Sequence, residues 1–298
     1  EYAESVNYRP NPIALSLKEN RSRAIGVIVP EIANHFFSQA INGIEAIAYN
    51  RGYHVVIFQS HESFEREAVN IQHVIARKVD GLIISLSGNT SDVKHIEDLE
   101  KENFPVVFFD RVPENVDGHK VVADNYKGAF MATEHLILSG RKKIAHITSP
   151  PLLSITIERL AGYKAALEKY QIPYDDELVK YCGFGSEEGH RAVRQLIQDK
   201  KPDAFFTASD RLALTCFAAV KESGLRIPQD VAFIGFTNLK VANLLDPPLS
   251  TIVQPALDIG QTAAELLLDT IEKKSKGKDY RTVTIPTILE SRTSSLSI

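Results

Sequence analysis

Short apolar runs alternate with longer amphipathic segments along most of this 298-residue chain. The first run, 24–30, is continuously apolar, which is typical of a strand buried on both faces of a parallel sheet. The next segment, 34–51, has apolar residues at helical spacing and ends at Gly52, as helices often do. Other apolar runs predict strands at 53–58, 80–85, 105–110, 120–123, 143–148, 178–181, 203–207 and 231–236. The amphipathic segments between them predict helices near 62–78, 91–102, 125–139, 155–170, 186–199 and 211–222.

The pattern begins again in the second half of the chain. Lys-Val-Asp at 78–80 precedes one predicted strand much as Lys-Pro-Asp at 201–203 precedes another, and 104–110 resembles 230–236. Strands that alternate with helices form parallel sheets, so two such series predict an α/β fold of two doubly wound lobes. The last part of the chain predicts a strand or crossover at 251–255, a long helix at 256–273 and a strand at 282–285.

The segment before the first strand has a pattern of its own. Asn11 followed by Pro12 is a helix-start signal, because a capping side chain precedes a proline whose missing N–H costs nothing at the first helical position. Ile13 and Leu17 are four residues apart and share one face. The helix can run only over 12–18, about two turns, and so short a helix is marginal in water.

Charge distinguishes this segment from the rest of the chain. Residues 8–23 hold four basic side chains against the single acid Glu19, whereas the chain as a whole has a net charge of −4. A basic, conditionally folded helix attached to an acidic body indicates a nucleic-acid contact. A capped surface linker explains the same residues equally well, so these residues alone leave both interpretations open.

Composition excludes several classes of protein. A content of 44% hydrophobic and 24% charged residues is ordinary for a globular protein, and no apolar run is long enough to span a membrane. The two cysteines, Cys182 and Cys216, have neither metal-binding nor redox spacing, which suggests buried thiols in a reducing compartment, the cytoplasm. We find no phosphate-binding glycine loop, no zinc-protease motif and no nucleophile elbow. We therefore expect no enzyme activity, no catalytic residue, no cofactor and no metal site.

Polar and aromatic residues follow the predicted strands in both halves. They are Asn34 to Phe37, Asp110 and Arg111, Ser149, Ser209 and Asp210, and Thr237 and Asn238. Ligands of doubly wound sheets bind beyond the carboxyl ends of the strands, so these residues predict a cleft between the lobes. Aromatic side chains with a few polar groups suit a small polar ligand such as a sugar or a nucleoside.

Several motifs occur in a fixed order along the whole chain. They are Arg-Pro-Asn-Pro-Ile-Ala-Leu-Ser-Leu from Arg9, Phe-Asp-Arg at 109–111, Arg-Leu-Ala-Gly-Tyr at 159–163, Pro-Gln-Asp-Val-Ala-Phe-Ile-Gly at 228–235 and Glu-Ser-Arg at 290–292. In this order and spacing they resemble the LacI/GalR (lactose-repressor/purine-repressor) family of bacterial transcription regulators. The residues from Glu1 are similar to the end of the last headpiece helix, so we expect the family's helix-turn-helix to precede this chain.

The resemblance implies a periplasmic-binding-protein-like core with three crossovers between the lobes, near Asp124, Thr251 and Tyr280. It implies a division into a headpiece end and hinge at 1–23, a first lobe of 24–123 plus 252–279, and a second lobe of 124–251 plus 280–298. The implied function is a ligand-responsive, sequence-specific DNA-binding regulator, a repressor that senses a small polar metabolite such as a sugar. An extracytoplasmic solute-binding protein of the same bilobal fold is the alternative.

The resemblance also implies the effector-binding residues, namely Phe36, Phe37, Asp110, Arg159, Phe184, Ser209, Asp210 and Thr237. Some have plainer interpretations: Phe36 and Phe37 can be core residues, Asp110 and Asp210 caps, and Arg159 a solvated partner of Glu158. We favour Phe37, Asp110 and Arg159 as ligand contacts. Thr237 and Ser209 stand where many sugar-binding relatives carry aspartate and asparagine, so the identity of the effector stays open.

For the hinge, the family implies paired helices that enter the minor groove of operator DNA in a homodimer. The DNA-binding residues would be Arg9, Asn11, Ile13, Ala14, Leu17 and Lys18. Leu17 matches the leucine that such hinges push between base steps. The expected partners are therefore operator DNA, a small-molecule effector and a second copy of the chain, with no membrane.

Overall fold

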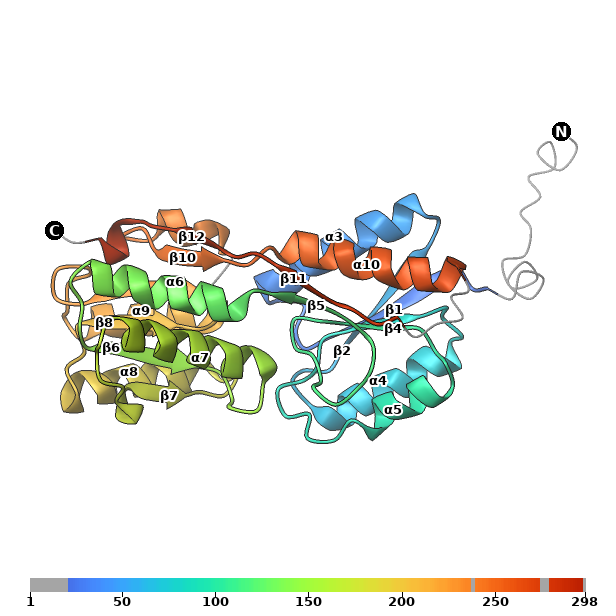
Figure 1. The fold of residues 1–298 in the computed structure, drawn as a ribbon, viewed down its shortest axis with the longest axis horizontal. Coiled ribbons are helices and arrows are strands. Elements are labelled where there is room, and N and C mark those ends of the chain that lie inside the picture. Colours follow the sequence, from blue (N-terminus) through green and yellow to red (C-terminus); the bar gives the residue numbers. More distant parts are fainter. Residues whose placement is uncertain (1–20, 237–238, 274–278, 297–298) are drawn as a thin grey trace, which may run out of the picture.

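The computed structural model describes residues 21–236, 239–273 and 279–296. These residues form two lobes that lie side by side along the long axis of the molecule (Figure 1). Each lobe contains a six-stranded sheet with helices on both faces, so the predicted α/β fold of two doubly wound lobes is confirmed. The predicted hinge, with Arg9, Asn11, Ile13, Ala14, Leu17 and Lys18, lies outside the described residues, as does Thr237.

The sheet of the first lobe is parallel throughout and has the order β11-β5-β4-β3-β1-β2. Its strands are β1 (Ala24–Val29), β2 (His54–Gln59), β3 (Leu82–Ile84), β4 (Val106–Phe109), β5 (His119–Ala123) and β11 (Thr282–Ile285). One face is covered by α3 (His35–Asn50) and α10 (Ala256–Lys273), and the other by α4 (Phe64–Ala76) and α5 (Lys94–Lys101). Five of the six residues of β1 are fully buried, as its uninterrupted apolar run predicts.

The sheet of the second lobe has the order β12-β10-β9-β8-β6-β7. Its strands are β6 (Ile144–Thr148), β7 (Val179–Tyr181), β8 (Ala204–Thr207), β9 (Ala232–Phe236), β10 (Ser250–Val253) and β12 (Ile288–Glu290). The helices are α6 (Asn125–Leu138) and α7 (Ser154–Lys169) on one face and α8 (Ser186–Asp199) and α9 (Asp210–Glu222) on the other. The edge strand β12 runs antiparallel to β10, and the sequence did not predict it.

The sequence repeat corresponds to a repeated contact. The carboxylate of Asp80 accepts hydrogen bonds from the backbone N–H groups of Ser22 (2.7 Å) and Arg23 (2.9 Å), just before β1. Asp203 accepts in the same way from Lys142 (2.8 Å) and Lys143 (2.9 Å), just before β6. In each lobe, therefore, an aspartate that precedes the third strand of the series fixes the start of the first strand.

The chain passes between the lobes three times, but two of the predicted boundaries are wrong. The first crossing, at Asp124, agrees with the structure. Residues 252 and 253 belong to β10 in the second sheet, so the second crossing falls at Gln254 rather than Thr251. The third falls after Ile285 rather than at Tyr280, because all four residues of β11 pair with β5 in the first sheet.

The first and third crossings are bonded to each other. The backbone N–H of Asp124 donates to the carbonyl of Ile285 (2.9 Å), and the hydroxyl of Thr287 donates to the carbonyl of Asp124 (3.3 Å). The side chain of Asp124 caps α6 by accepting from the N–H of Lys127 (3.0 Å). Asp124 is therefore structural, and the two connections form a hydrogen-bonded pair at the junction of the lobes.

Candidate functional site

A cleft lies between the lobes, at the carboxyl ends of the strands of both sheets. Its lining residues are Asn34, Phe36, Phe37, Asp110, Arg111, Ser149, Ile155, Arg159, Phe184, Ser209, Asp210, Arg211 and Gln254. The space left free between their side chains measures only about 40 Å³. The lobes are also bonded directly, since the N–H of Val112 donates to the hydroxyl of Ser154 (3.3 Å). The cleft is therefore narrow, with the lobes closed on each other.

Asp110 follows β4 and supplies the acidic group of the first-lobe wall. Its backbone has φ of 57°, in the left-handed region that aspartate tolerates better than most residues. The side chain is buried, and burial raises the pKa of the Asp110 carboxyl, while Arg111 and Arg159 act to lower it. A buried carboxylate next to two guanidinium groups can accept several hydrogen bonds from a hydroxylated ligand.

Arg111 connects the cleft to the loop that follows β3. Its Nη1 lies 2.6 Å from Oε2 of Glu62, which also accepts from the N–H of Gly88 (2.8 Å). The guanidinium lies 5.6 Å from the centre of the Phe37 ring. Its Nε is buried and has no hydrogen-bond partner among the described residues. Arg111 is thus held by an ion pair and still has one donor to offer.

Arg159 is the buried cation of the second-lobe wall. It lies on α7, donates from Nε to Oδ1 of Asn125 (2.9 Å) and from Nη1 to the carbonyl of Ala208, and stacks 3.9 Å from the centre of the Phe236 ring. Burial lowers the pKa of Arg159 to about 10, so the side chain stays charged at neutral pH. Nη2 is buried without a partner in the described part of the chain. The solvated pair with Glu158 is therefore wrong, because Glu158 bonds instead to Asn125 (2.8 Å).

Phe184 closes one side of the cleft. Its ring lies between two guanidinium groups, with Arg111 of the first lobe and Arg211 of the second each 5.1 Å from the ring centre. Arg211 also donates to the carbonyl of Phe184. A Cβ placed on Gly88 would lie 2.0 Å from the Phe184 ring, so a larger residue at this position would have to displace that ring. We call Phe184, Arg111, Arg211 and Gly88 the clasp, since they join the two lobes.

Ser209 and Asp210 begin α9. The hydroxyl of Ser209 accepts from the N–H of Leu212 (3.3 Å), so Ser209 is the helix cap and Asp210 is not. Both residues line the cleft, and Asp210 is buried. Gln254 reaches the cleft from the second crossing and is buried as well.

The cleft brings together seven of the eight predicted effector residues, and the eighth, Thr237, lies outside the described residues. Phe36 and Phe37 both line it and both belong to the core of the first lobe. The sequence did not single out Arg211, Gln254 and Glu62. Two of them could have been found from the sequence, since Arg211 directly follows the predicted Asp210 and Gln254 lies at a crossing between the lobes. Glu62 reaches the site only through Arg111, and no sequence pattern marks it.

Neither a metal site nor a membrane span emerges from the described part of the chain. No group of three or more histidine, cysteine, aspartate or glutamate side chains in 21–236, 239–273 and 279–296 is arranged to hold a metal ion. No helix in those ranges combines the length and apolar character needed to cross a membrane. The thiols of Cys182 and Cys216 are free and buried, and burial raises the pKa of Cys182 to about 11.

Two lobes that enclose a polar and aromatic cleft define a binding protein of the bilobal type. The family model described as "Periplasmic binding proteins and sugar binding domain of LacI family" matches residues 22–293, and the chain belongs to this family.

Its relatives include regulators of transcription. The chain is 35% identical over 296 residues to the HTH-type transcriptional repressor CytR of Escherichia coli K12, a match that covers 99% of this chain and 86% of CytR. Among solved structures, a complex of the transcriptional regulator CelR with cellobiose aligns with a TM-score of 0.84 and 28% identity, over 95% of this chain and 89% of that one. A LacI-family regulator of Enterococcus faecium with bound ribose aligns with a TM-score of 0.80 and 30% identity, over 92% of this chain and 99% of that one.

Proposed function

We propose that this chain is the effector-sensing part of a transcriptional repressor and that a small polyhydroxylated metabolite, a saccharide, binds between its lobes. The observation that carries the proposal is the Nη2 group of Arg159, which is buried in the cleft and has no partner among the described residues. A buried donor without a partner costs about 1–3 kcal/mol, and more when it is charged. A ligand hydroxyl that accepts from this group removes the cost, so the cleft is prepared for an acceptor at this position.

The remaining lining suits the same ligand. Asp110 and Asp210 supply acceptors, while Arg111 keeps a buried Nε donor. Phe36 and Phe37 supply apolar surface for the C–H face of a sugar ring. The bound cellobiose and ribose of two similar structures support this class of ligand. Phe184, Ser209 and Thr237 complete the proposed set of effector contacts.

The cleft must open before such a ligand enters. The free space of about 40 Å³ is far below the several hundred Å³ of ordinary ligand pockets. Opening separates Phe184 from Gly88 and Arg111 and exposes both walls. The effector then closes the lobes around itself, and its differential affinity for the open and closed forms sets how far it can shift their populations.

The first lobe connects this motion to DNA. Ser22 and Arg23 are bonded to Asp80, and Nη2 of Arg21 donates to the carbonyl of Ile271 on α10 (3.0 Å). The chain therefore enters the first lobe through fixed contacts. We propose that the cytoplasmic protein is a homodimer that contacts operator DNA through a helix-turn-helix ahead of residue 1 and through paired hinges over 11–18.

Ligand screening tests the cleft. Thermal-shift measurements with pentoses, hexoses, disaccharides and nucleosides identify the effector, and calorimetry then compares the parent chain with Arg159→Ala. Loss of the guanidinium should weaken binding by about 1.5–3 kcal/mol. Unchanged affinity would remove Arg159 from the site, and no ligand from these classes would overturn the proposed effector.

An extracytoplasmic solute-binding protein is the second candidate, because the same fold family includes periplasmic binding proteins. The gene sequence upstream of Glu1 separates the two. A helix-turn-helix there supports the regulator, whereas a signal peptide supports the solute-binding protein.

A further inference from the structure

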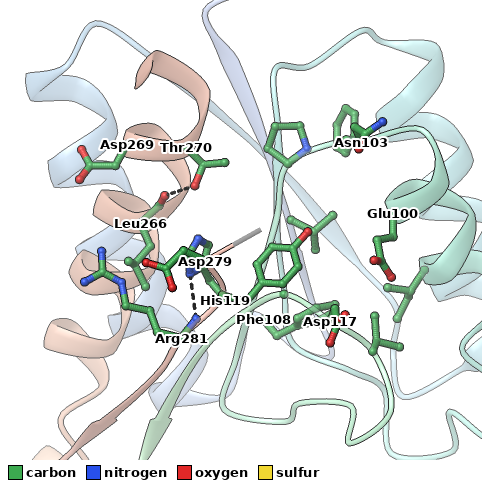
Figure 2. A pocket seen from close by; sticks show the side chains of 17 residues that line it. Glu100, Asn103, Phe108, Asp117, His119, Leu266, Asp269, Thr270, Asp279 and Arg281 are labelled. Atoms are coloured by element: carbon green, nitrogen blue, oxygen red, sulfur yellow. Dashed lines mark hydrogen bonds between the residues drawn. The ribbon is translucent and has the colours of Figure 1, made fainter. Parts of the chain in front are cut away.

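The buried polar side chains of the first lobe lie at one end of its sheet. A cavity of about 430 Å³ occupies the other end, between α5, α10 and the amino ends of β4, β5 and β11 (Figure 2). None of its lining residues that the structure describes has a buried polar side-chain atom without a partner. The polar side chains buried in 24–123 lie instead near the carboxyl ends of the strands, toward the cleft, and they are Ser60, Glu67, Ser85, Ser87, Asp110 and Arg111.

Glu67 of α4 is a fully buried acidic residue of this group. Its Oε2 accepts a hydrogen bond from the backbone N–H of Ser87 (2.6 Å), and its Oε1 accepts from the hydroxyl of Thr90 (3.0 Å). Nε2 of His95 lies 2.9 Å from Oε1, and because a carboxylate can only accept, this nitrogen carries the proton. Donors from the loop that follows β3 and from α5 therefore converge on one carboxylate.

A second glutamate holds the next residue of the same loop. Oε2 of Glu62 accepts from the N–H of Gly88 (2.8 Å), so Glu62 and Glu67 bind two consecutive backbone N–H groups. Glu62 and the preceding His61 have φ of 59° and 50°, in the left-handed region, which is strained for residues other than glycine. The turn before α4 thus maintains a strained backbone where it presents Glu62 to the loop 87–90.

This loop forms the first-lobe side of the clasp. Gly88 lies where an added Cβ would come 2.0 Å from the ring of Phe184, which belongs to the second lobe. Glu62 also pairs with Arg111, whose guanidinium lies 5.1 Å from the centre of the same ring. A displacement of the loop would therefore change the contact between the lobes. Glu67 itself does not line the cleft.

We infer that Glu67 is a positioning residue of the effector cleft. It fixes the loop 87–90 where Gly88 meets the Phe184 ring, and it thereby favours the closed lobes without touching the effector. An apolar side chain of similar size would fill the same place without the cost of desolvating a carboxylate. The carboxylate supplies what an apolar side chain lacks, a fixed acceptor for the loop. The inference rests on the proposed function, which requires the lobes to open and close.

Amide hydrogen exchange measures the two contacts without an effector. The N–H of Ser87 reports on the loop, and the N–H of Val112 reports on the junction of the lobes, because it donates to the hydroxyl of Ser154 in the second lobe (3.3 Å). NMR on the complete chain measures both exchange rates, with the N–H of Gly26 in the buried strand β1 as the reference for global unfolding. Exchange becomes faster in proportion to the population of the open state.

Two variants weaken the contacts of the carboxylate. Glu67→Gln keeps the volume of the side chain but replaces one acceptor oxygen by a donor. We expect exchange at Ser87 and at Val112 to become at least about fivefold faster, after correction for global unfolding. Thr90→Val removes one of the donors and should give a smaller change in the same direction. It also provides the test if Glu67→Gln does not fold.

Two comparisons separate this role from general support of the fold. Asp80→Asn is the matched control, because Asp80 accepts backbone hydrogen bonds at the amino end of β3, and it should leave exchange at Val112 within about twofold of the parent. In a Phe184→Ala background the ring of the clasp is already removed. There Glu67→Gln should change exchange at Val112 by less than about twofold.

Faster exchange at Ser87 with unchanged exchange at Val112 would show that Glu67 secures only its own loop, and it would overturn the inference. So would an effect on Val112 that keeps its full size in the Phe184→Ala background. Since no effector enters these measurements, the two failures are distinguishable. A cleft that binds no saccharide would contradict the proposed function, whereas the exchange rates alone decide the role of Glu67.

Discussion

Nε of Arg159 donates a hydrogen bond to Oδ1 of Asn125, with 2.9 Å between the two atoms. Asn125 is the first residue of α6 and directly follows the crossing at Asp124. Its side-chain nitrogen donates to the carbonyl of Ala123 (3.1 Å) and to Glu158 (2.8 Å). One buried amide therefore orients the arginine that we assign to the effector and joins it to the chain segment between the lobes.

Replacing this amide should affect both stability and binding. Asn125→Ala leaves Arg159 and Glu158 with fewer partners in a buried place, so we expect a loss of about 3 kcal/mol in the free energy of unfolding. Effector affinity should fall as well, because the guanidinium loses its orientation. Denaturant unfolding and calorimetry measure the two effects. Asn50→Ala, at the exposed end of α3, is the control and should change stability by less than about 0.5 kcal/mol. Equal stability of the two variants would contradict this role of Asn125.

The clasp predicts a change in the shape of the molecule. Phe184→Ala removes the ring between Arg111 and Arg211, and Gly88→Ala displaces that ring from the opposite lobe. A desolvated cation–π contact is worth about 1–2 kcal/mol, so the ratio of closed to open lobes should fall about 5- to 30-fold. Small-angle X-ray scattering without ligand should show a larger radius of gyration for both variants. If neither variant expands, the clasp does not hold the lobes together.

His146 predicts a dependence of stability on pH. It is fully buried in β6, stacked on Phe206 (4.6 Å) and Tyr163 (5.2 Å), and burial lowers the pKa of His146 from 6.5 to about 3. Below pH 6.5 the unfolded chain takes up a proton that the folded chain does not bind. The stability that the neutral, buried His146 contributes is therefore lost as pH falls from 6.5 toward 3, at about 1.4 kcal/mol per pH unit.

A substitution isolates this contribution. His146→Asn keeps an amide that can donate to the carbonyl of Phe206 but cannot titrate. The free energy of unfolding of this variant should depend less steeply on pH between 6.5 and 5, by about 2 kcal/mol over that interval. The exposed His73→Gln on α4 serves as the control and should keep the slope of the parent. Parallel curves for the parent and His146→Asn would show that His146 is protonated in the folded state.

How much of the fold the sequence could predict depended on how local the signal was. Asp80 and Asp203 follow similar residues in the sequence, and each accepts hydrogen bonds from the backbone before the first strand of its lobe. The repeat could therefore be predicted from the sequence. The sequence did not show which sheet Thr282–Ile285 joins, because a four-residue strand with alternating burial can complete the edge of either sheet. Its pairing with β5 depends on where the third crossing falls, which no local pattern encodes.

The effector site likewise contains residues that local sequence signals predicted and contacts that they did not predict. Asp110, Arg159 and Asp210 occupy strand ends or a family motif and were predicted individually. The contact of Phe184 with Gly88 joins loops of different lobes, and it depends on the missing side chain of a glycine. The free donor on Arg159 arises because its other nitrogens are bonded to Asn125 and Ala208, a condition that only the folded structure reveals.

The hinge gives a prediction for DNA. In a protein that carries a helix-turn-helix ahead of residue 1, Leu17→Ala should lower affinity for the specific operator and reduce its bending, because a leucine wedge exchanges a few kcal/mol of unstacking for a bent duplex with more contacts. Binding to random duplex, which is driven by phosphate charge, should barely change. Electrophoretic mobility and fluorescence anisotropy measure bending and affinity. Equal losses on both duplexes, or no loss on either, would contradict the wedge.

Operator binding with and without the effector tests the central claim most directly. The protein carrying its helix-turn-helix is titrated onto its operator by fluorescence anisotropy at fixed salt, first alone and then with saturating effector. We predict that the effector changes operator affinity at least fivefold, which is the lower range of allosteric coupling, and that Arg159→Ala binds the operator but no longer responds at that effector concentration. Operator affinity that is the same with and without saturating effector would contradict the account.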